Sequence, residues 1–261
     1  MEKREKIEKL AQDKDEAMLL ARVYDRITAA EQRNIPAATA FLSLREQVLT
    51  GQLLRGMALH FFGGCEQAER KLCCWLPDYL DESWLWSEDS PCAAVRAEFF
   101  AQDKLSHRDF LGALMGAGIK RETVGDIFVS EGQCDFLVTR EILPYVLQNL
   151  VSAGRAKLTL HELPLTELSA PQAQVKTIRD TVASLRLDSV VSSGFGLSRG
   201  KAALYIESGK TELGHLPCMK ADKPVAEGDV ISVRGLGKLR LEEISGTTKK
   251  GRIGIIISRF V

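Results

Sequence analysis

The sequence has no long hydrophobic run. None of its 261 residues belongs to a stretch approaching the roughly 18 consecutive apolar residues that a membrane-spanning helix needs. The chain begins MEKREKIEKL, which is charged where a secretory signal peptide would be hydrophobic. We therefore expect a cytoplasmic protein that is neither secreted nor inserted into a membrane.

Cysteine and histidine are present but follow no metal-binding pattern. The six cysteines include no C-x-x-C pair and have no histidines at ligand spacing. The four histidines are scattered, which favours packed or surface roles over metal coordination or general base catalysis. We expect no zinc site and no disulfide framework, which suits a reducing compartment.

Motifs for nucleotide and acyl chemistry are also absent. There is no G-x-x-x-x-G-K-[ST] phosphate loop and no G-x-S-x-G elbow, and the glycines of GALMGAG fall on an expected helix rather than after a strand. Nucleotide hydrolysis is therefore not indicated. We expect no cofactor and no small-molecule substrate.

The formal net charge is zero, because 35 basic residues balance 35 acidic ones. The two signs are nevertheless distributed unevenly along the chain. Residues 176–261 carry 15 Lys and Arg against 9 Asp and Glu, whereas residues 1–175 carry 20 against 26. A basic C-terminal module thus follows an acidic segment, residues 1–175. This asymmetry is typical of a protein in which one domain binds nucleic acid. An anionic membrane surface is the competing partner for such a charge.

Residues 1–85 predict a mostly helical N-terminal domain. Apolar periodicity indicates one long helix over residues 2–33 and a second from about Ser43 to Met57. A short strand over Ala58–Phe62 follows, and a third helix is expected from near Glu66 to just before Pro77. The acidic, turn-rich segment at residues 81–91 marks a boundary.

Residues 86–170 predict a ferredoxin-like domain with the order β-α-β-β-α-β, so the fold class is α+β. We expect strands at 93–99, 126–129, 134–138 and 156–160 and helices at 106–117 and 141–153. RNA-recognition domains share this topology, but their aromatic strand motif is absent, and Phe128 and Phe136 are better placed in the core. A second RNA surface, as an alternative to ordinary surface charge, would consist of His107, Arg108, Lys120, Arg121, Arg155 and Lys157.

Residues 175–261, after the linker SAPQAQ, open with two short helices. In the first, Leu187, Val190 and Val191 form one apolar stripe, which Gly194 and Gly196 are expected to end. Ser198 is a natural N-cap for the second helix, whose buried side would carry Ala202, Ala203 and Ile206 before Gly209 stops it.

Two cations occupy the start of this second helix. Arg199 and Lys201 lie where the helix dipole disfavours positive charge by about 0.3–1 kcal/mol each. Free backbone N–H groups, the Ser198 hydroxyl and these cations would together form an anion site, and a polyanion backbone is its favoured large occupant. A solvated helix start with chance charges is the alternative.

Strands are expected at 210–213 and 229–234, followed by a C-terminal hairpin. The hairpin loop SGTTKKGR brings three cations together, either as a solvated turn or as a phosphate contact. They are Lys249, Lys250 and Arg252.

Several of these elements, in order, resemble the αL RNA-binding domain first described in the small-subunit ribosomal protein S-four. They are the R-L-D opening at 186–188, the S-R-x-x-A helix, the G-K strand start and the E-G-D turn. The upstream segments FFGGCEQAERK, PCAAVRAEFF, LSHRDFLGALMGAGIKRETVGDIFV and GQCDFLVT resemble the bacterial YlmH family. By this resemblance Arg186, Ser198, Arg199 and Lys201 would face RNA, with Lys210 and Arg234 as further candidates.

The resemblance implies a non-catalytic protein that binds structured RNA, both ribosomal RNA and tRNA. It further implies association with large ribosomal subunits that hold peptidyl-tRNA after translation stalls, in rescue or quality control. An RNA-modifying enzyme or accessory is one alternative, because R-L-D superficially repeats a pseudouridine synthase motif, although Asp188 is better read as bonding the turn locally. A scaffold docking an acidic protein is the other.

Overall fold

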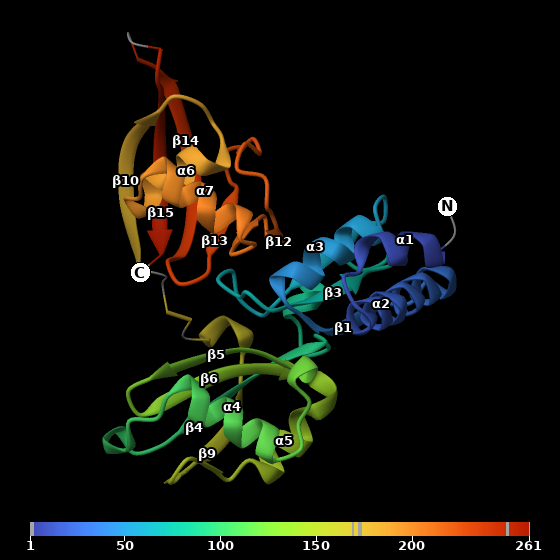
Figure 1. Cartoon of the computed structure of the whole chain (residues 1–261). Coiled ribbons are helices and arrows are strands. Elements are labelled where there is room, and N and C mark those ends of the chain that lie inside the picture. The colour runs from blue at the N-terminus through green and yellow to red at the C-terminus, as the bar shows by residue number, and fades with distance from the viewer. Residues whose placement is uncertain (1–2, 169, 172–173, 249–250, 261) are drawn as a thin grey trace. The chain divides into compact units, whose positions relative to one another are not determined.

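The computed structural model describes residues 3–168, 170–171, 174–248 and 251–260. The chain divides into two compact units, Met1–Pro171 and Gln172–Val261 (Figure 1). Both units combine helices with antiparallel sheets, so the α+β class is confirmed. No helix among the described residues is long and apolar enough to cross a bilayer.

The first unit begins with two helices rather than one. They are α1 (Lys3–Leu10) and α2 (Lys14–Arg33). The single helix expected over residues 2–33 is wrong because Asp13 adopts an extended conformation and caps α2, accepting a hydrogen bond from the Glu16 N–H at 2.9 Å. A third helix, α3 (Leu44–Leu53), starts at a capping box between Ser43 and Glu46.

A three-stranded sheet accompanies these helices, in the order β1-β3-β2. Its strands are β1 (Ala37–Leu42), β2 (Leu59–Phe62) and β3 (Lys71–Trp75). The helix expected from Glu66 to Pro77 is wrong, because that segment contributes the central strand. Its residues from Leu72 to Trp75 are all buried, so the alternation that usually marks a strand is missing. All six cysteines of the chain are free thiols.

The second sheet of this unit has the order β5-β6-β4-β9, with every neighbouring pair antiparallel. Two helices connect its strands in the β-α-β-β-α-β order of a ferredoxin-like fold. The elements are β4 (Cys92–Glu98), α4 (His107–Gly116), β5 (Val124–Ser130), β6 (Gln133–Thr139), α5 (Leu143–Asn149) and β9 (Thr159–Leu163). The expected strand at 156–160 is divided between β9 and a hairpin of β7 (Ser152–Ala153) with β8 (Ala156–Lys157).

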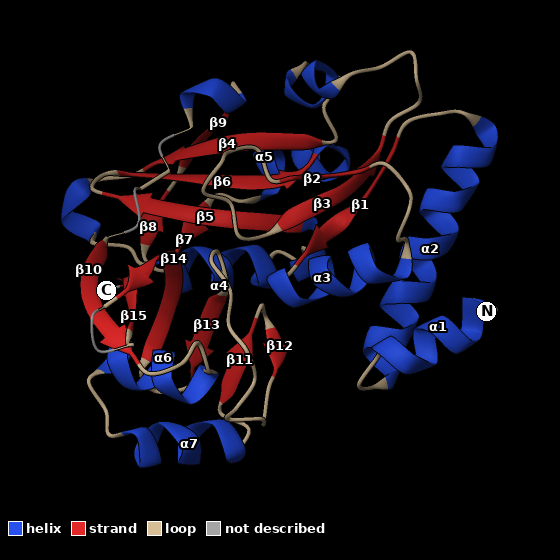
Figure 2. Ribbon diagram, turned by 90° about the horizontal axis from the view of Figure 1, so that it is seen from above, coloured by secondary structure: helices blue, strands red, loops and turns tan. Residues whose placement is uncertain are grey.

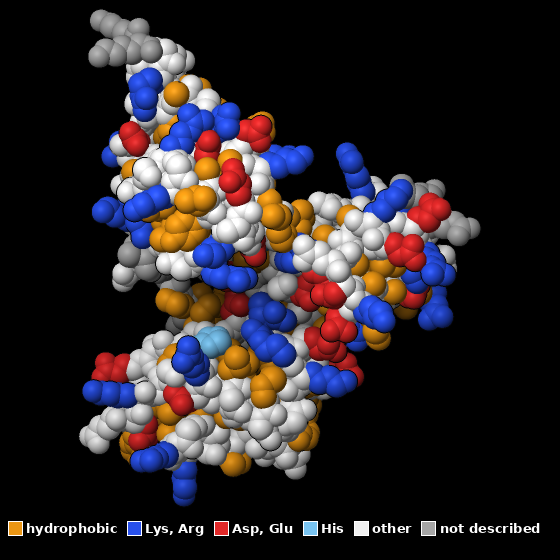
Figure 3. Space-filling model, viewed as in Figure 1, with side chains coloured by type: hydrophobic (Ala, Val, Ile, Leu, Met, Phe, Trp, Pro, Cys, Tyr) orange, Lys and Arg blue, Asp and Glu red, His pale blue; other side chains and the backbone are white. Residues whose placement is uncertain are grey.

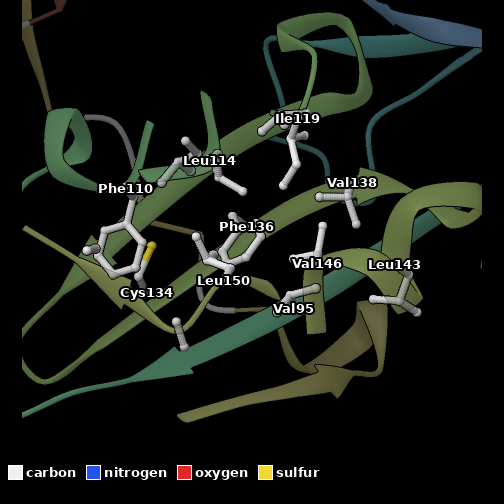
Figure 4. Close-up of a cluster of buried hydrophobic side chains, with 14 of the residues drawn as sticks. Val95, Phe110, Leu114, Ile119, Cys134, Phe136, Val138, Leu143, Val146 and Leu150 are labelled. Carbon is white, nitrogen blue, oxygen red and sulfur yellow. The ribbon is translucent and has the colours of Figure 1, made fainter. Parts of the chain in front are cut away.

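Both faces of this sheet are buried. Figure 4 shows Phe110 and Leu114 of α4 and Val146 of α5 packed against Phe136 on one face. On the other face Leu137 joins a core that includes residues of the first sheet, such as Phe41 and Leu72. Phe136 is fully buried and Phe128 is half-buried against that second core, so both belong to the interior, as the sequence favoured.

The remaining short 3-10 turns of the first unit connect these elements. They are η1 (Glu82–Trp86), η2 (Ala101–Asp103), η3 (Arg121–Thr123), η4 (Arg140–Ile142) and η5 (Leu165–Glu167).

The second unit is a six-stranded antiparallel sheet in the order β10-β15-β14-β13-β11-β12, with two helices on one face (Figure 2). The helices are α6 (Leu187–Phe195) and α7 (Arg199–Glu207). The strands are β10 (Val175–Val182), β11 (Thr211–Leu213), β12 (Leu216–Pro217), β13 (Val230–Val233), β14 (Gly237–Thr247) and β15 (Ile253–Phe260). Strand β10 was not expected, and it pairs with β15 along its whole length.

The helix pair packs as its apolar residues predict. Leu187, Val190 and Val191 are fully buried, and so are Ala202 and Ile206. Ala203 is half-buried.

One expected helix break is wrong. Helix α6 continues through Gly194 and ends at Gly196, which takes the left-handed conformation with φ 65°. A Cβ on Gly194 would lie 2.4 Å from Leu239 Cδ2 of β14. Gly194 therefore allows close contact between helix and sheet, rather than ending the helix.

Candidate RNA interface

The start of α7 has the predicted cap. Ser198 Oγ accepts a hydrogen bond from the Lys201 backbone N–H at 3.3 Å. The Lys201 side chain is exposed, and its ammonium makes no bond with any residue that the structure describes. The first turn of α7 thus presents backbone donors and a free cation on the surface, which is the composition of an anion site.

Arg199 has a partner within the protein. Its Nε donates to Asp188 Oδ2 at 3.0 Å and its Nη2 donates to Oδ1 at 3.3 Å. The Asp188 side chain is only 7% exposed, whereas that of Arg199 is 51% exposed. The charge of Arg199 at a helix start is therefore explained first by Asp188, and one edge of its guanidinium is held in place while the rest reaches solvent.

Asp188 also binds Arg186. Arg186 Nη2 lies 3.4 Å from Oδ2, and the Arg186 side chain is 42% exposed. Ser189 Oγ donates to the other carboxylate oxygen at 3.2 Å. One buried carboxylate therefore orients two arginines, at the starts of α6 and α7, toward a shared stretch of surface.

Arg252 lies on the same part of the unit as Arg199. The two arginines line a cavity of about 190 Å³, together with Ser189, Ser192 and Ser193 of α6. Arg252 Nε donates to Thr181 Oγ1 at 2.8 Å, which fixes the arginine against β10. The structure thus brings one cation of the hairpin loop to the helix pair, while Lys249 and Lys250 lie outside the described residues.

Lys210 and Arg234 form a separate pair at the far end of α7. The Arg234 backbone N–H donates to the Lys210 carbonyl at 2.8 Å, and the Lys210 ammonium lies 5.5 Å from the centre of the Tyr205 ring. Helix α7 has nine residues, so about 13 Å separates this pair from Ser198 along the helix.

Two exposed lysines near the helix pair, Lys220 and Lys223, were not among the residues predicted from the sequence to bind RNA. The exposed Lys220 and Lys223 flank a loop whose carbonyls accept hydrogen bonds from the first turn of α6, such as Leu187 N–H to Lys223 O at 2.9 Å. This loop is bonded to the segment that holds Arg186 and Asp188. The available signal was the cation spacing in the segment KADKP, at 220–224.

The second basic surface expected in the first unit is only partly assembled. His107 and Arg108 begin α4. Arg155 and Lys157 belong to the β7–β8 hairpin. This hairpin lies beside the first turn of α4, because a Cβ on Gly154 would lie 3.6 Å from the Asp109 side chain. These four residues are exposed.

The other two residues of that surface lie past the far end of α4. Lys120 is exposed there, whereas Arg121 is half-buried and donates through Nη1 to Val124 O at 2.6 Å. Lys120 and Arg121 therefore lie at the opposite end of α4 from His107 and Arg108.

Lysine and arginine side chains are spread over the visible face of the second unit (Figure 3). Within the described residues, no group of three or more His, Cys, Asp or Glu side chains is arranged to hold a metal ion.

Comparison with known proteins identifies the family. Over 250 residues the chain is 34% identical to "Ribosome-associated protein quality control protein P2" of Bacillus subtilis (strain 168), covering 94% of this chain and 96% of that protein. Residues 97–167 match the family described as "Putative RNA-binding domain in YlmH". The chain belongs to the YlmH family. The family predicted from the sequence is confirmed.

A solved structure shares the fold of this YlmH-family chain. It is "Cell division protein ylmH from Streptococcus pneumoniae", with a TM-score of 0.50 and 21% identity over 60% of this chain and 96% of that one. This likeness concerns the fold. The matched RNA-binding region, 97–167, includes all six residues of the second basic surface.

Proposed function

We propose that this YlmH-family protein is a non-catalytic RNA-binding protein of the cytoplasm that associates with the large ribosomal subunit. It would act where that subunit still holds peptidyl-tRNA, in rescue or quality control of stalled translation. The observation that carries the proposal is the pair of half-exposed arginines, Arg186 and Arg199, oriented by the buried Asp188 beside the capped start of α7. The relative named for ribosome-associated quality control supports the ribosomal partner.

The geometry suits recognition of an RNA backbone. Arginine donates pairs of hydrogen bonds to phosphate in a fixed plane, and holding one edge on Asp188 reduces the entropy lost when the other edge binds. Lys201, with no partner in the described chain, adds an adjustable charge beside it. Such contacts position a protein on structured RNA by shape and phosphate spacing rather than by base sequence.

The enzyme alternative assigns Asp188 a catalytic role. In the structure both carboxylate oxygens are occupied by Arg199, Arg186 or Ser189, and the side chain is nearly inaccessible. A nucleophile or general base must reach its substrate, whereas a carboxylate that orients arginines must stay where it is. These contacts favour the binding role.

The test uses one charge reversal with a matched control. Lys201→Glu removes an unpaired cation without breaking any contact in the described chain, and it favours the helix dipole. Lys176→Glu makes the same change on β10, at another exposed lysine without a described partner. Lys201→Glu should reduce cosedimentation with large subunits at least tenfold at unchanged thermal stability, and Lys176→Glu should have a much smaller effect.

The scaffold alternative predicts different behaviour in the same gradients. Association with large subunits that survives the Lys201→Glu change would contradict the site. A complex that persists in the soluble fraction after RNase treatment would favour an acidic protein partner instead of RNA.

A further inference from the structure

A larger cavity, of about 440 Å³, lies in the first unit, where α2 meets β1 and the turn η3. Its volume falls within the range of small-molecule sites, about 300–1,000 Å³. Four arginines and two glutamates line it, with Leu19 and Val23 of α2 among the apolar lining residues. The excess of positive charge inside a partly apolar cavity calls for a physical explanation.

Two of the arginines converge on one backbone carbonyl, with Asp126 and, for Arg70, Glu46 as nearby acids at longer range. Arg70 Nε donates to Val124 O at 3.1 Å, and Arg121 Nη1 donates to the same oxygen at 2.6 Å. Both side chains are half-buried, and neither forms an ion pair with a described acid. Burial lowers the pKa of both guanidinium groups, and the nearby Arg70 lowers that of Arg121 further. Each group also keeps N–H donors that no described residue uses.

The acidic groups around the cavity are already engaged. Glu46 accepts the Ser43 N–H at 2.6 Å in its capping box, and Asp126, next to the cavity, accepts the backbone N–H groups of Glu69 and Arg70. Glu122 lies 3.9 Å from Arg22, which is a weak contact. Arg26, the fourth arginine, is exposed and bonds no described residue.

We propose that this cavity binds the phosphate group of a nucleotide. The phosphate would lie among Arg26, Arg70 and Arg121, and the organic part would contact Leu19 and Val23. Planar guanidinium groups match phosphate oxygens in pairs, and the negative charge of a phosphate offsets part of the excess of arginines over glutamates in the lining, whether it is a monoester or a diester. Two sources share this chemistry, a free mononucleotide and a nucleotide within an RNA strand.

The experiment measures binding to the full chain by isothermal titration calorimetry, with AMP, adenosine and a short oligoadenylate as probes. Arg26→Gln removes a cavity arginine that contributes no described contact to the fold. Arg33→Gln is the matched control, because Arg33 ends the same helix, is exposed and does not line the cavity. AMP should bind while adenosine does not, Arg26→Gln should weaken AMP binding at least tenfold, and Arg33→Gln should leave it unchanged.

The probes separate the two sources. Binding of AMP that depends on Arg26 identifies a free nucleotide as a sufficient ligand. Binding of oligoadenylate alone, again dependent on Arg26, identifies a nucleotide within RNA. If neither probe shows binding that depends on Arg26, the proposal is overturned. The result is independent of the α6–α7 site, because Lys201→Glu tests ribosome association through the other unit.

Discussion

Arg199, at the start of α7, donates to both carboxylate oxygens of Asp188, in the first turn of α6. An acid in the first turn of a helix is favoured by the helix dipole, and a cation there is disfavoured. Asp188 is therefore favourably placed in α6, and its ion pair compensates for the unfavourable position of Arg199 in α7. It also holds the guanidinium in place, which would lower the ordering cost of the RNA binding proposed for this site.

Replacing Asp188 with Asn should weaken RNA binding even though it makes the unit more positive. The change leaves Arg199 and Arg186 without their orienting charge, so we expect a loss of about 1–3 kcal/mol in the free energy of unfolding. Urea denaturation and RNA titration measure the two effects. Asp222→Asn is the matched control, because Asp222 is exposed in the 220–224 segment and has no described partner. Tighter RNA binding by the Asp188 variant would show that orientation is unimportant.

RNA affinity should fall steeply with salt. If about six phosphates are neutralised by the basic unit, binding should weaken about a thousandfold between about 50 and 200 mM salt, because bound counterions are released on association. Fluorescence anisotropy with labelled ribosomal RNA fragments measures the slope. Lys201→Glu should reduce the slope by about one phosphate contact. An affinity independent of salt would argue against a phosphate-based interface.

Asp135 should be critical for the stability of the first unit. Its side chain is 1% exposed and forms two hydrogen bonds of 2.7 Å with Arg96, its direct partner across strands β6 and β4. Removing one member of a buried ion pair costs about 3–5 kcal/mol, so Asp135→Asn should lower the unfolding free energy by that order. Glu162→Gln breaks the half-exposed pair with Arg140 and should cost less than about 1 kcal/mol. Equal losses in urea denaturation would contradict this ranking.

The helix pair could be predicted because its signals are local. The stripe Leu187, Val190 and Val191, the Ser198 cap and the Gly209 stop all act within a few residues of one another. The partner of Arg199 could not be predicted in the same way. Asp188 lies eleven positions earlier, and their contact depends on how α6 and α7 pack.

Strands β3 and β10 could not be predicted for the same reason, because they depend on contacts with distant segments. Strand β10 is mostly exposed and polar, and it becomes a strand through pairing with β15, more than seventy residues later. Strand β3 is buried on both faces between β1 and β2, so its apolar run has no period of two. In both cases the deciding interactions come from distant segments, which local periodicity does not report.

Acid should remove the stabilisation contributed by Glu16. Arg45 donates to both Glu16 carboxylate oxygens, at 2.5 and 3.1 Å, and this hydrogen bonding lowers the pKa of Glu16 below its ordinary value of 4.5. A carboxylate with a lowered pKa in the folded state stabilises the fold at pH above the ordinary value, and that contribution is lost as the pH falls through the lowered pKa. Both side chains are mostly buried, so a contribution of about 1 kcal/mol is expected.

The measurement compares urea unfolding of the native chain and Glu16→Gln at pH 7, 5 and 3.5. The difference in unfolding free energy should be nearly the same at pH 7 and 5 and should shrink at pH 3.5, because Glu16 of the unfolded chain then takes up a proton below its ordinary pKa of 4.5 while the folded chain holds its carboxylate charged to lower pH. Glu8→Gln provides the control, since its pair with Arg4 is largely exposed and should show no measurable difference at any of the three values. A Glu16 difference that stays constant down to pH 3.5 would mean that packing of the side chain, rather than its charge, links α2 to Arg45 of α3.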